Sequence, residues 1–243
     1  MMKISQEAKE KTKIKIIQSA VDLITKNGYK NTSLREIASN AGVSNPTIYN
    51  YFPSKENLLY DYLEYKHIQA FEIITAIENF NTYTLREQIQ TLIDTELELY
   101  LEDREFILEI ADMVFDTSSF NINSLYNTNQ LFIEIISQML EVAIEAKEIE
   151  RPPFFEYMPH LFWDYFVSIV FYWTKDQSKS FENTTQLIDH SMSLVESILS
   201  SNILSKVSNL TLFFIKNHLK RGMKEFTKKQ LNLEIIKKDL KGV

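Results

Sequence analysis

The sequence predicts an all-α protein, and three observations carry that prediction. The chain of 243 residues has only four Gly and five Pro, whereas β-proteins of this length use many of both in turns. Apolar residues recur at three- and four-residue spacing along most of the chain, which is the helical period. Helix-capping residues precede several of these apolar runs. We expect three consecutive parts, which comprise residues 1–54, 55–205 and 206–243.

The composition excludes several classes of function. A chain without Cys has no disulfide scaffold, thiol nucleophile or thiolate metal site. The four His lie far apart and no glycine-rich phosphate loop occurs, so we expect no enzyme activity, no cofactor and no metal. The start of the chain lacks an apolar signal segment, and the most apolar stretch, residues 162–173, is too short to span a bilayer. We therefore expect a cytoplasmic protein.

The net charge of −7 is unevenly distributed along the chain. Residues 1–66 hold 10 basic and 7 acidic residues, which gives +3. Residues 67–205 hold 6 basic and 23 acidic residues, which gives −17, whereas residues 206–243 hold 10 basic and 3 acidic residues, which gives +7. Each basic end is suited to an anionic polymer, an anionic membrane or the acidic middle itself.

The first 50 residues predict two helices separated by a turn. Residues 7–27 form one apolar helical face, and Gly28 follows as a stop. Ser33 and Glu36 have the spacing of a capping box, which opens a short second helix that ends at Gly42.

A third helix is expected directly after this turn. Ser44 can cap a helix over residues 45–51, where Pro46 is tolerated because first-turn N–H groups have no partner within the helix. The next helix begins at Lys55. Two short helices joined by a glycine turn and braced by a longer one form a helix-turn-helix. Polar side chains on the second of them suit base edges and phosphates, although a small helical bundle with a polar surface would show the same pattern.

The local sequence is more specific than the helix count. It looks like the DNA-binding domain of TetR-family transcriptional regulators over roughly residues 10–62. The segments that carry this resemblance are Gly28-Tyr29, Thr32-Ser33-Leu34-Arg35-Glu36-Ile37-Ala38, Ala41-Gly42-Val43-Ser44 and Thr47-Ile48-Tyr49-Asn50-Tyr51-Phe52-Pro53-Ser54-Lys55-Glu56-Asn57-Leu58-Leu59. The resemblance implies an all-helical homodimer whose third helix enters the major groove of a palindromic DNA operator, with a larger C-terminal domain that binds a small-molecule effector.

The resemblance also implies roles for individual residues. The positions that match DNA-contacting positions of the family are Thr32, Ser33, Arg35, Ser44, Asn45, Pro46, Thr47, Tyr49, Asn50, Tyr51 and Lys55. Lys55 resembles the family's phosphate-binding Lys, and Ile48 and Phe52 are expected in the core. Asn45 departs from the family, whose members often carry Lys or Arg there. Because Asn prefers adenine, an operator rich in A·T is a hypothesis.

The acidic middle of the chain reads as successive helices with helical apolar spacing. Thr84 and Glu87 form a second capping box. The expected helices cover residues 84–102, 103–115, 124–147, 156–175 and 183–201.

The last two of these helices carry wide apolar stripes. Their position resembles the helix pair through which TetR-family subunits form a four-helix bundle, although such stripes can also close the monomer's own core. The residues expected at the dimer interface are Met158, Leu161, Tyr165, Ile169, Ile188, Met192, Val195 and Leu199.

The effector pocket is only weakly marked by the sequence. Aromatic residues are dense in 154–173, and the expected lining residues are Met113, Tyr126, Phe162, Trp163 and Phe166. Aromatic residues at helical spacing are more often plain core. Four acidic residues recur along one helix face, Glu105, Glu109, Asp112 and Asp116. This face could receive a cationic ligand or a basic partner, or it could simply be exposed to solvent.

Residues 206–243 predict an amphipathic helical extension with a row of Lys at four-residue spacing. Three interpretations remain open. The extension packs on the subunit or its mate, it binds a membrane surface or protein partner, or it adds contacts to the DNA backbone. The sequence as a whole thus predicts a dimeric repressor that a small-molecule effector releases from its operator. The alternative is a DNA-bound protein regulated by a membrane or protein partner through this extension.

Overall fold

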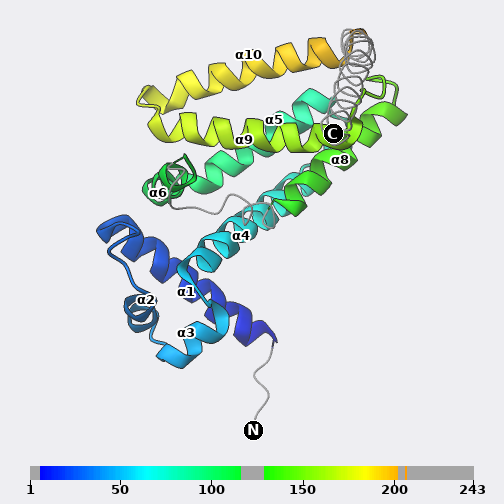
Figure 1. Cartoon of the computed structure of the whole chain (residues 1–243). Coiled ribbons are helices and arrows are strands. Elements are labelled where there is room, and N and C mark those ends of the chain that lie inside the picture. Colours follow the sequence, from blue (N-terminus) through cyan, green and yellow to red (C-terminus); the bar gives the residue numbers. More distant parts are fainter. Residues whose placement is uncertain (1–5, 116–128, 202–205, 207–243) are drawn as a thin grey trace, which may run out of the picture.

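The protein is all-helical throughout the part of the chain that the computed structural model describes, which is residues 6–115, 129–201 and 206. Three helices, shown in blue in Figure 1, form a small head: α1 (Gln6–Asn27), α2 (Leu34–Asn40) and α3 (Asn45–Tyr51). The longer helices after the head form a larger C-terminal bundle: α4 (Lys55–Thr75), α5 (Leu85–Tyr100), α6 (Arg104–Phe115), α8 (Gln130–Glu145), α9 (Met158–Lys175) and α10 (Glu182–Leu199).

Capping hydrogen bonds fix the starts of the short helices in the head. The N–H of Ser33 donates to Glu36 Oε2 at 2.7 Å, and the N–H of Glu36 donates back to Ser33 Oγ at 3.3 Å, which confirms the predicted capping box. Ser44 Oγ accepts from the N–H of Thr47 at 3.3 Å and thereby caps α3. Gly42, with φ of +63°, makes the turn between α2 and α3 in a conformation that other residues rarely adopt.

The head has its own apolar core, because a helix of seven residues is marginal without packing. The fully buried side chains of the head include Ile16, Ala20, Ile37, Ala38, Ala41, Ile48 and Phe52. Ile48 and Phe52 are therefore core residues, as predicted. Because these two side chains point into the core, the opposite face of α3 is exposed to solvent.

The C-terminal bundle is built around α4, which runs from the head into the bundle (Figure 1). α4 packs against α1 in the head and against α5 and α8 in the bundle. α9 lies across α6 and α8, whereas α10 packs on α5 and α9 as the outermost helix on the side away from the head (Figure 1). Within the described residues, the predicted helix positions agree with these bounds to within a few residues, and residues 124–128 of the predicted helix 124–147 lie outside the described part of the chain.

Several expectations concern residues that lie outside the described part of the chain. They are the effector residue Tyr126, the acidic residue Asp116 and, apart from Lys206, the basic extension 206–243. Within residues 6–115 and 129–201, none of the helices combines the length and the apolar character that crossing a bilayer requires.

Candidate DNA-binding head and ligand cavity

The outward face of α3 carries most of the predicted DNA-contacting side chains. Ser44, Asn45, Pro46, Tyr49 and Asn50 are exposed. Thr47 and Tyr51 are half-buried, and Thr47 shares a hydrogen bond of 2.7 Å with Ser44 between their hydroxyl oxygens. A two-turn helix with one buried apolar side and one polar side has the form of a helix that enters the major groove.

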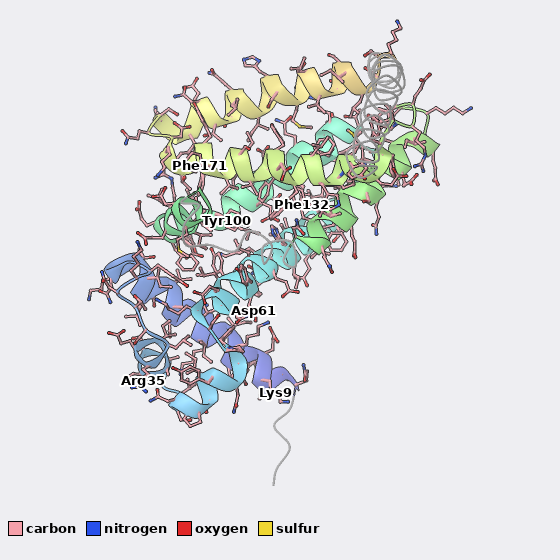
Figure 2. All side chains as sticks on the ribbon, viewed as in Figure 1. Lys9, Arg35, Asp61, Tyr100, Phe132 and Phe171 are labelled. Atoms are coloured by element: carbon pink, nitrogen blue, oxygen red, sulfur yellow. The ribbon has the colours of Figure 1, made fainter. Side chains whose placement is uncertain are left out.

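Arg35 extends from the start of α2 beside this face. It is exposed and makes no ion pair with any other residue of the described part. Ser33, also exposed, lies at the cap of the same helix. Figure 2 shows Arg35 on α2 and Lys9 on α1 at opposite ends of the head in that view. An unpaired guanidinium in this place is available to a phosphate or a guanine.

Thr32 differs from the prediction that its side chain contacts phosphate. Only 2% of Thr32 is exposed, and its hydroxyl donates to the carbonyl oxygens of Gly28 at 3.0 Å and Leu23 at 3.3 Å. Thr32 therefore terminates α1 by satisfying main-chain oxygens at its end. Its side chain is directed into the protein.

The ammonium of Lys55, which was predicted to bind a phosphate, is hydrogen-bonded within the protein. Its ammonium donates to the carbonyl oxygens of Tyr29 at 2.5 Å and Thr32 at 2.6 Å, and it lies 4.1 Å from the centre of the Tyr29 ring. Burial lowers the pKa of Lys55, an effect that the nearby Glu56 and Glu36 partly offset. Lys55 thus ties the first turn of α4 to the loop before α2.

Sequence reasoning missed one cation of the head. Lys15 is exposed on α1, and a Cβ atom at Gly42 would lie 3.6 Å from its Nζ, so this ammonium lies at the turn between α2 and α3. The basic spacing on α1 was visible in the sequence, but nothing there indicates which Lys reaches that turn.

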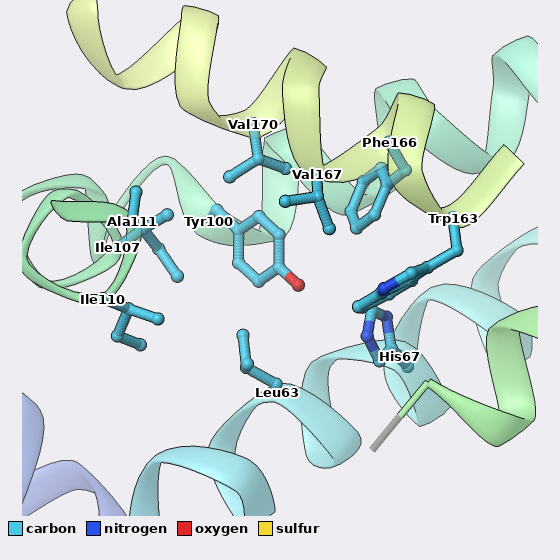
Figure 3. A pocket seen from close by; sticks show the side chains of 10 residues that line it. All are labelled: Leu63, His67, Tyr100, Ile107, Ile110, Ala111, Trp163, Phe166, Val167 and Val170. Atoms are coloured by element: carbon cyan, nitrogen blue, oxygen red, sulfur yellow. The ribbon is translucent and has the colours of Figure 1, made fainter. Parts of the chain in front are cut away.

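A cavity of about 60 Å³ lies between α4, α5, α6 and α9 in the C-terminal bundle (Figure 3). Its lining is almost entirely apolar: Leu63, His67, Tyr100, Ile107, Ile110, Ala111, Trp163, Phe166, Val167 and Val170. Two of the predicted effector residues, Trp163 and Phe166, therefore line one cavity. A single water needs about 10–15 Å³ of such space, so the volume is several times larger than one water requires.

Behind the wall of this cavity, His67 in α4, which lines it, forms a buried pair with Glu96 in α5. The side chains of both are 1% exposed, and His67 Nδ1 lies 2.5 Å from Glu96 Oε1. The rings of Phe132, Trp163 and Phe166 surround the imidazole at centroid distances of 6.0, 5.7 and 6.1 Å. His67 Nε2 and Glu96 Oε2 are buried and have no hydrogen-bond partner within the described residues. Such an unpaired atom costs about 1–3 kcal/mol of stability.

The two other predicted effector residues within the described part of the chain, Phe162 and Met113, line separate hollows. Phe162 lines a separate hollow of about 240 Å³ between α5 and α10, beside Arg86 and Glu196. Met113 lines a hollow of about 520 Å³ at the junction of the head and the bundle, with Tyr29 and Glu109. The expectation of one pocket that contains all these side chains is therefore corrected, because adjacent positions on a helix face different directions.

The predicted dimer residues divide between two faces of α9 and α10. Leu161 is 58% exposed, and Met158, Tyr165 and Val195 are half-buried. Four others, Ile169, Ile188, Met192 and Leu199, are at most 6% exposed and belong to the core of the monomer. The apolar residues of these two helices that are exposed are Leu161, Tyr172, Leu187 and Leu194.

Two carboxylates of the acidic row on α6 form contacts with other parts of the protein. Glu109 Oε2 accepts a hydrogen bond of 3.1 Å from the N–H of Tyr29, and Asp112 pairs with Lys175 at 2.7 Å. Glu105 is exposed. Two of these carboxylates thus hold neighbouring elements together. No group of His, Asp or Glu within the described residues has an arrangement that could hold a metal ion.

The head, with its exposed α3, and the separate helical bundle define a helix-turn-helix DNA-binding protein. Residues 16–61 match the family described as bacterial regulatory proteins, tetR family, and residues 88–214, just over half of the chain, match the tetracyclin repressor-like C-terminal domain. The chain belongs to the TetR family of transcriptional regulators.

Individual relatives agree with this assignment. The HTH-type transcriptional regulator YuxN of Bacillus subtilis is 38% identical over 105 residues, which cover 41% of this chain but only 33% of that protein. The fatty acid metabolism regulator protein of Bacillus subtilis is 26% identical over 139 residues, which cover 57% of this chain and 71% of that protein. The structure of FadR from Bacillus subtilis in complex with stearoyl-CoA shares the fold, with a TM-score of 0.57 and 22% identity over 78% of this chain and 98% of that chain.

Proposed function

We propose that this TetR-family protein is a homodimeric repressor that an apolar effector releases from a palindromic operator. The observation that carries the proposal is the polar, outward face of α3 on a packed head, joined by α4 to a bundle that contains an apolar cavity. Release requires only a modest coupling between the two sites. A coupling free energy of about 1–3 kcal/mol changes operator affinity about 5–150-fold.

The proposed DNA contacts follow the exposure of the head. Asn45, Thr47 and Asn50 read base edges, and Arg35 contacts a phosphate or a guanine. Ser33, Ser44, Pro46, Tyr49 and Tyr51 border the backbone, and Lys15 adds a cation that sequence reasoning did not include. Thr32 and Lys55 support this surface from behind through their bonds to the loop that precedes α2.

The proposed dimer surface is the exposed face of α9 and α10, covered by a second copy of this chain. Leu161 and Tyr172 are eleven residues apart and Leu187 and Leu194 are seven apart, so each pair recurs on one helical stripe. Tyr165 shares a hydrogen bond of 2.6 Å with Ser191 and holds the two helices together beneath it. A dimer is also required by geometry, since two recognition helices must enter major grooves about 34–36 Å apart.

The proposed effector is a fatty acyl compound. The cavity walls are apolar, and two relatives point in this direction: one is a fatty acid metabolism regulator and another was solved with stearoyl-CoA. An acyl chain buried there would gain about 0.8 kcal/mol per CH₂ group.

Binding-site selection from random duplex DNA, followed by titration with acyl-CoA, tests the proposal. We expect a palindromic site with half-sites about one helical turn apart, bound by a dimer and released by octanoyl-CoA. Selection of no sequence, or of a single unrepeated half-site bound by a monomer, contradicts the dimeric repressor. A palindromic site that stays bound at all acyl-CoA concentrations contradicts the effector while leaving the DNA-binding function in place.

A further inference from the structure

Two aromatic side chains are exposed just before α9, beside a group of unpaired carboxylates. Phe154 is 56% exposed and Tyr157 is 65% exposed. Glu145, Glu150 and Glu156 are also exposed, and none of the three forms an ion pair within the described residues. These five residues lie between the last residue of α8 and the residue before α9, and we call them the α8–α9 patch. An exposed apolar surface rimmed by polar residues is a common form of interaction site.

The last helix of the bundle, α10, ends next to this patch. Phe162, in the first turns of α9, and Leu199, at the end of α10, line the same hollow of about 240 Å³. Glu148, which lies in the turn between α8 and α9, lines it as well. The helices α9 and α10 are therefore antiparallel, and α10 ends beside the start of α9. The chain thus continues beyond Ser201 from the end of the bundle that carries the patch.

The next segment of the sequence complements the patch in both polarity and charge. Residues 206–243 hold 10 basic and 3 acidic residues, whereas residues 145–157 hold four acidic and two basic residues. Apolar residues step by three or four along the segment, which is the spacing of one helix face. The residues of this apolar stripe are Leu212, Ile215, Leu219, Met223 and Phe226. Lys216, Lys220 and Lys224 follow one edge of the stripe. The match to the C-terminal family domain ends at residue 214, so most of the segment lies beyond it.

We infer that residues 206–243 dock as an amphipathic helix on the α8–α9 patch of their own chain. The apolar stripe covers Phe154 and Tyr157, and the lysines along its edge face the unpaired carboxylates. Docking within one chain needs only a short connection. The eleven residues from Ser201 to Leu212 span about 16 Å even when fully helical, whereas packed helices lie about 8–10 Å apart. A short connection also gives an effective concentration on the order of millimolar, which favours the segment's own chain over a second one.

The absence of Cys from the chain allows a direct test by disulfide trapping in the full-length protein. Tyr157→Cys is combined with Leu219→Cys, at the centre of the apolar stripe, and oxidised with diamide. We expect a cross-link within one chain, which migrates faster on a non-reducing gel. Tyr157→Cys with Arg221→Cys is the matched control, because positions 219 and 221 are about 200° apart on a helix. This control should cross-link about tenfold or more slowly, since only undocked chains bring its two thiols together.

Thiol alkylation measures how often the patch is covered. Only undocked chains expose the thiol of Tyr157→Cys, so its reaction with iodoacetamide should be slow. Adding Leu219→Glu places a charge in the apolar stripe and should accelerate the reaction about tenfold or more. Adding Asn217→Glu introduces the same charge on the other side of the helix and should leave the rate nearly unchanged. Circular dichroism confirms that each variant is folded.

Charge reversal tests the contact between the lysines and the carboxylates in the same alkylation experiment. Lys216→Glu with Lys220→Glu reverses two charges at the edge of the stripe, and the Tyr157→Cys thiol should then react severalfold faster. Arg221→Glu with Lys228→Glu changes the net charge equally on the far side of the helix and should have a smaller effect. Equal rates in the two double variants would overturn the proposed ion pairing.

Other results would overturn the docking itself. Cross-links between two chains, seen at twice the mass, would assign the segment to the mate. Equal trapping at positions 219 and 221, or an alkylation rate that Leu219→Glu leaves unchanged, would show that the segment does not cover the patch. Protection that appears only after anionic phospholipid vesicles or duplex DNA are added would assign the segment to that surface instead. The proposed repressor function stands in each case, because the docking does not rest on it.

Discussion

The N–H of Tyr29 donates a hydrogen bond of 3.1 Å to Glu109 Oε2, and this bond joins the loop after α1 to α6. It is one of the contacts between the DNA-binding head and the bundle, since α1 and α6 also pack against each other. The carboxylate lies on a helix whose other residues, Ile107 and Ile110, line the cavity. The head and the cavity thus share α6.

Glu109→Ala should loosen this junction. The substitution leaves a main-chain N–H without its partner, and we expect the free energy of unfolding to fall by about 1 kcal/mol. Hydrogen exchange at the Tyr29 amide should accelerate. Glu105→Ala, one turn earlier on the exposed side of α6, is the control and should change neither quantity. Unchanged exchange at Tyr29 in the Glu109 variant would contradict the prediction.

Lys55→Ala and Arg35→Ala should weaken DNA binding by different routes. Arg35 faces outward, so its loss should reduce the slope of log K against log salt by about 0.9, the value of one phosphate contact. The ammonium of Lys55 is bonded to two carbonyl oxygens, so its loss should destabilise the head by about 1–3 kcal/mol and leave the slope unchanged. Fluorescence anisotropy over a range of salt concentrations measures both. A reduced slope for Lys55→Ala would instead assign it a phosphate contact.

Asn50→Ala should change sequence preference more than total affinity. Asn50 is exposed on the outer face of α3, and a good contact to a base edge is worth about 1–3 kcal/mol of discrimination. Selection of binding sites by the variant should lose the preference at one base pair of each half-site. Asn40→Ala, at the exposed end of α2, is the matched control. An identical selected site for wild type and Asn50→Ala would exclude this contact.

Charged substitutions on the outer face of α9 and α10 should separate the subunits. Leu161→Glu and Leu194→Glu replace side chains that are 58% and 61% exposed, so the monomer should keep its fold while the dimer dissociates. Val142→Glu, at a position that is 52% exposed on α8, introduces the same charge away from that face and should leave the dimer intact. Sedimentation velocity distinguishes the two. A dimer that survives both Leu substitutions would place the interface elsewhere.

Asp176 should make stability depend on pH in acid. Burial alone would raise its pKa, but hydrogen bonds from Thr184 and Ser178 outweigh burial and lower the pKa from 3.8 to about 2. Because the folded-state pKa is depressed, this stabilisation is complete above about pH 4 and is lost as the pH falls towards 2. Asp176→Asn should flatten that part of the profile in acid unfolding followed by circular dichroism. A wild-type profile with no slope between pH 4 and pH 2 would contradict the assignment.

The features that could be predicted from sequence are those set by local chemistry. The bounds of α3 follow from the N-cap Ser44, from Pro46 in the first turn and from the C-cap Phe52 before Pro53. All of these residues lie within ten positions of one another. The second capping box behaves in the same way, since Thr84 and Glu87 form both of its hydrogen bonds around the start of α5. Such contacts span three or four residues, so the sequence spacing determines them.

The features that could not be predicted depend on contacts between distant segments. On α10, Leu187 with Leu194 and Ile188 with Met192 form two apolar stripes, and only the packing of α5 and α9 decides which stripe is buried. His67 and Glu96 are 29 residues apart on different helices, so no motif connects them. The sequence places the cation of Lys55 at the start of a helix. It does not show that the ammonium donates hydrogen bonds to two carbonyl oxygens of the preceding loop.

The continuity of α4 has a mechanical consequence. Lys55 at its first turn holds the loop of the head, and His67 at the cavity lies twelve residues further along the same helix. At a rise of 1.5 Å per residue, the two residues are separated by about 18 Å along the axis of the helix. A tilt of about 5° about the cavity end therefore displaces the head end by about 1.6 Å. In the proposed dimer, symmetric tilts of both subunits would change the separation of the two α3 helices by about 3 Å. A ligand that tilts α4 by only a few degrees would thus change the spacing at which that dimer meets the DNA grooves.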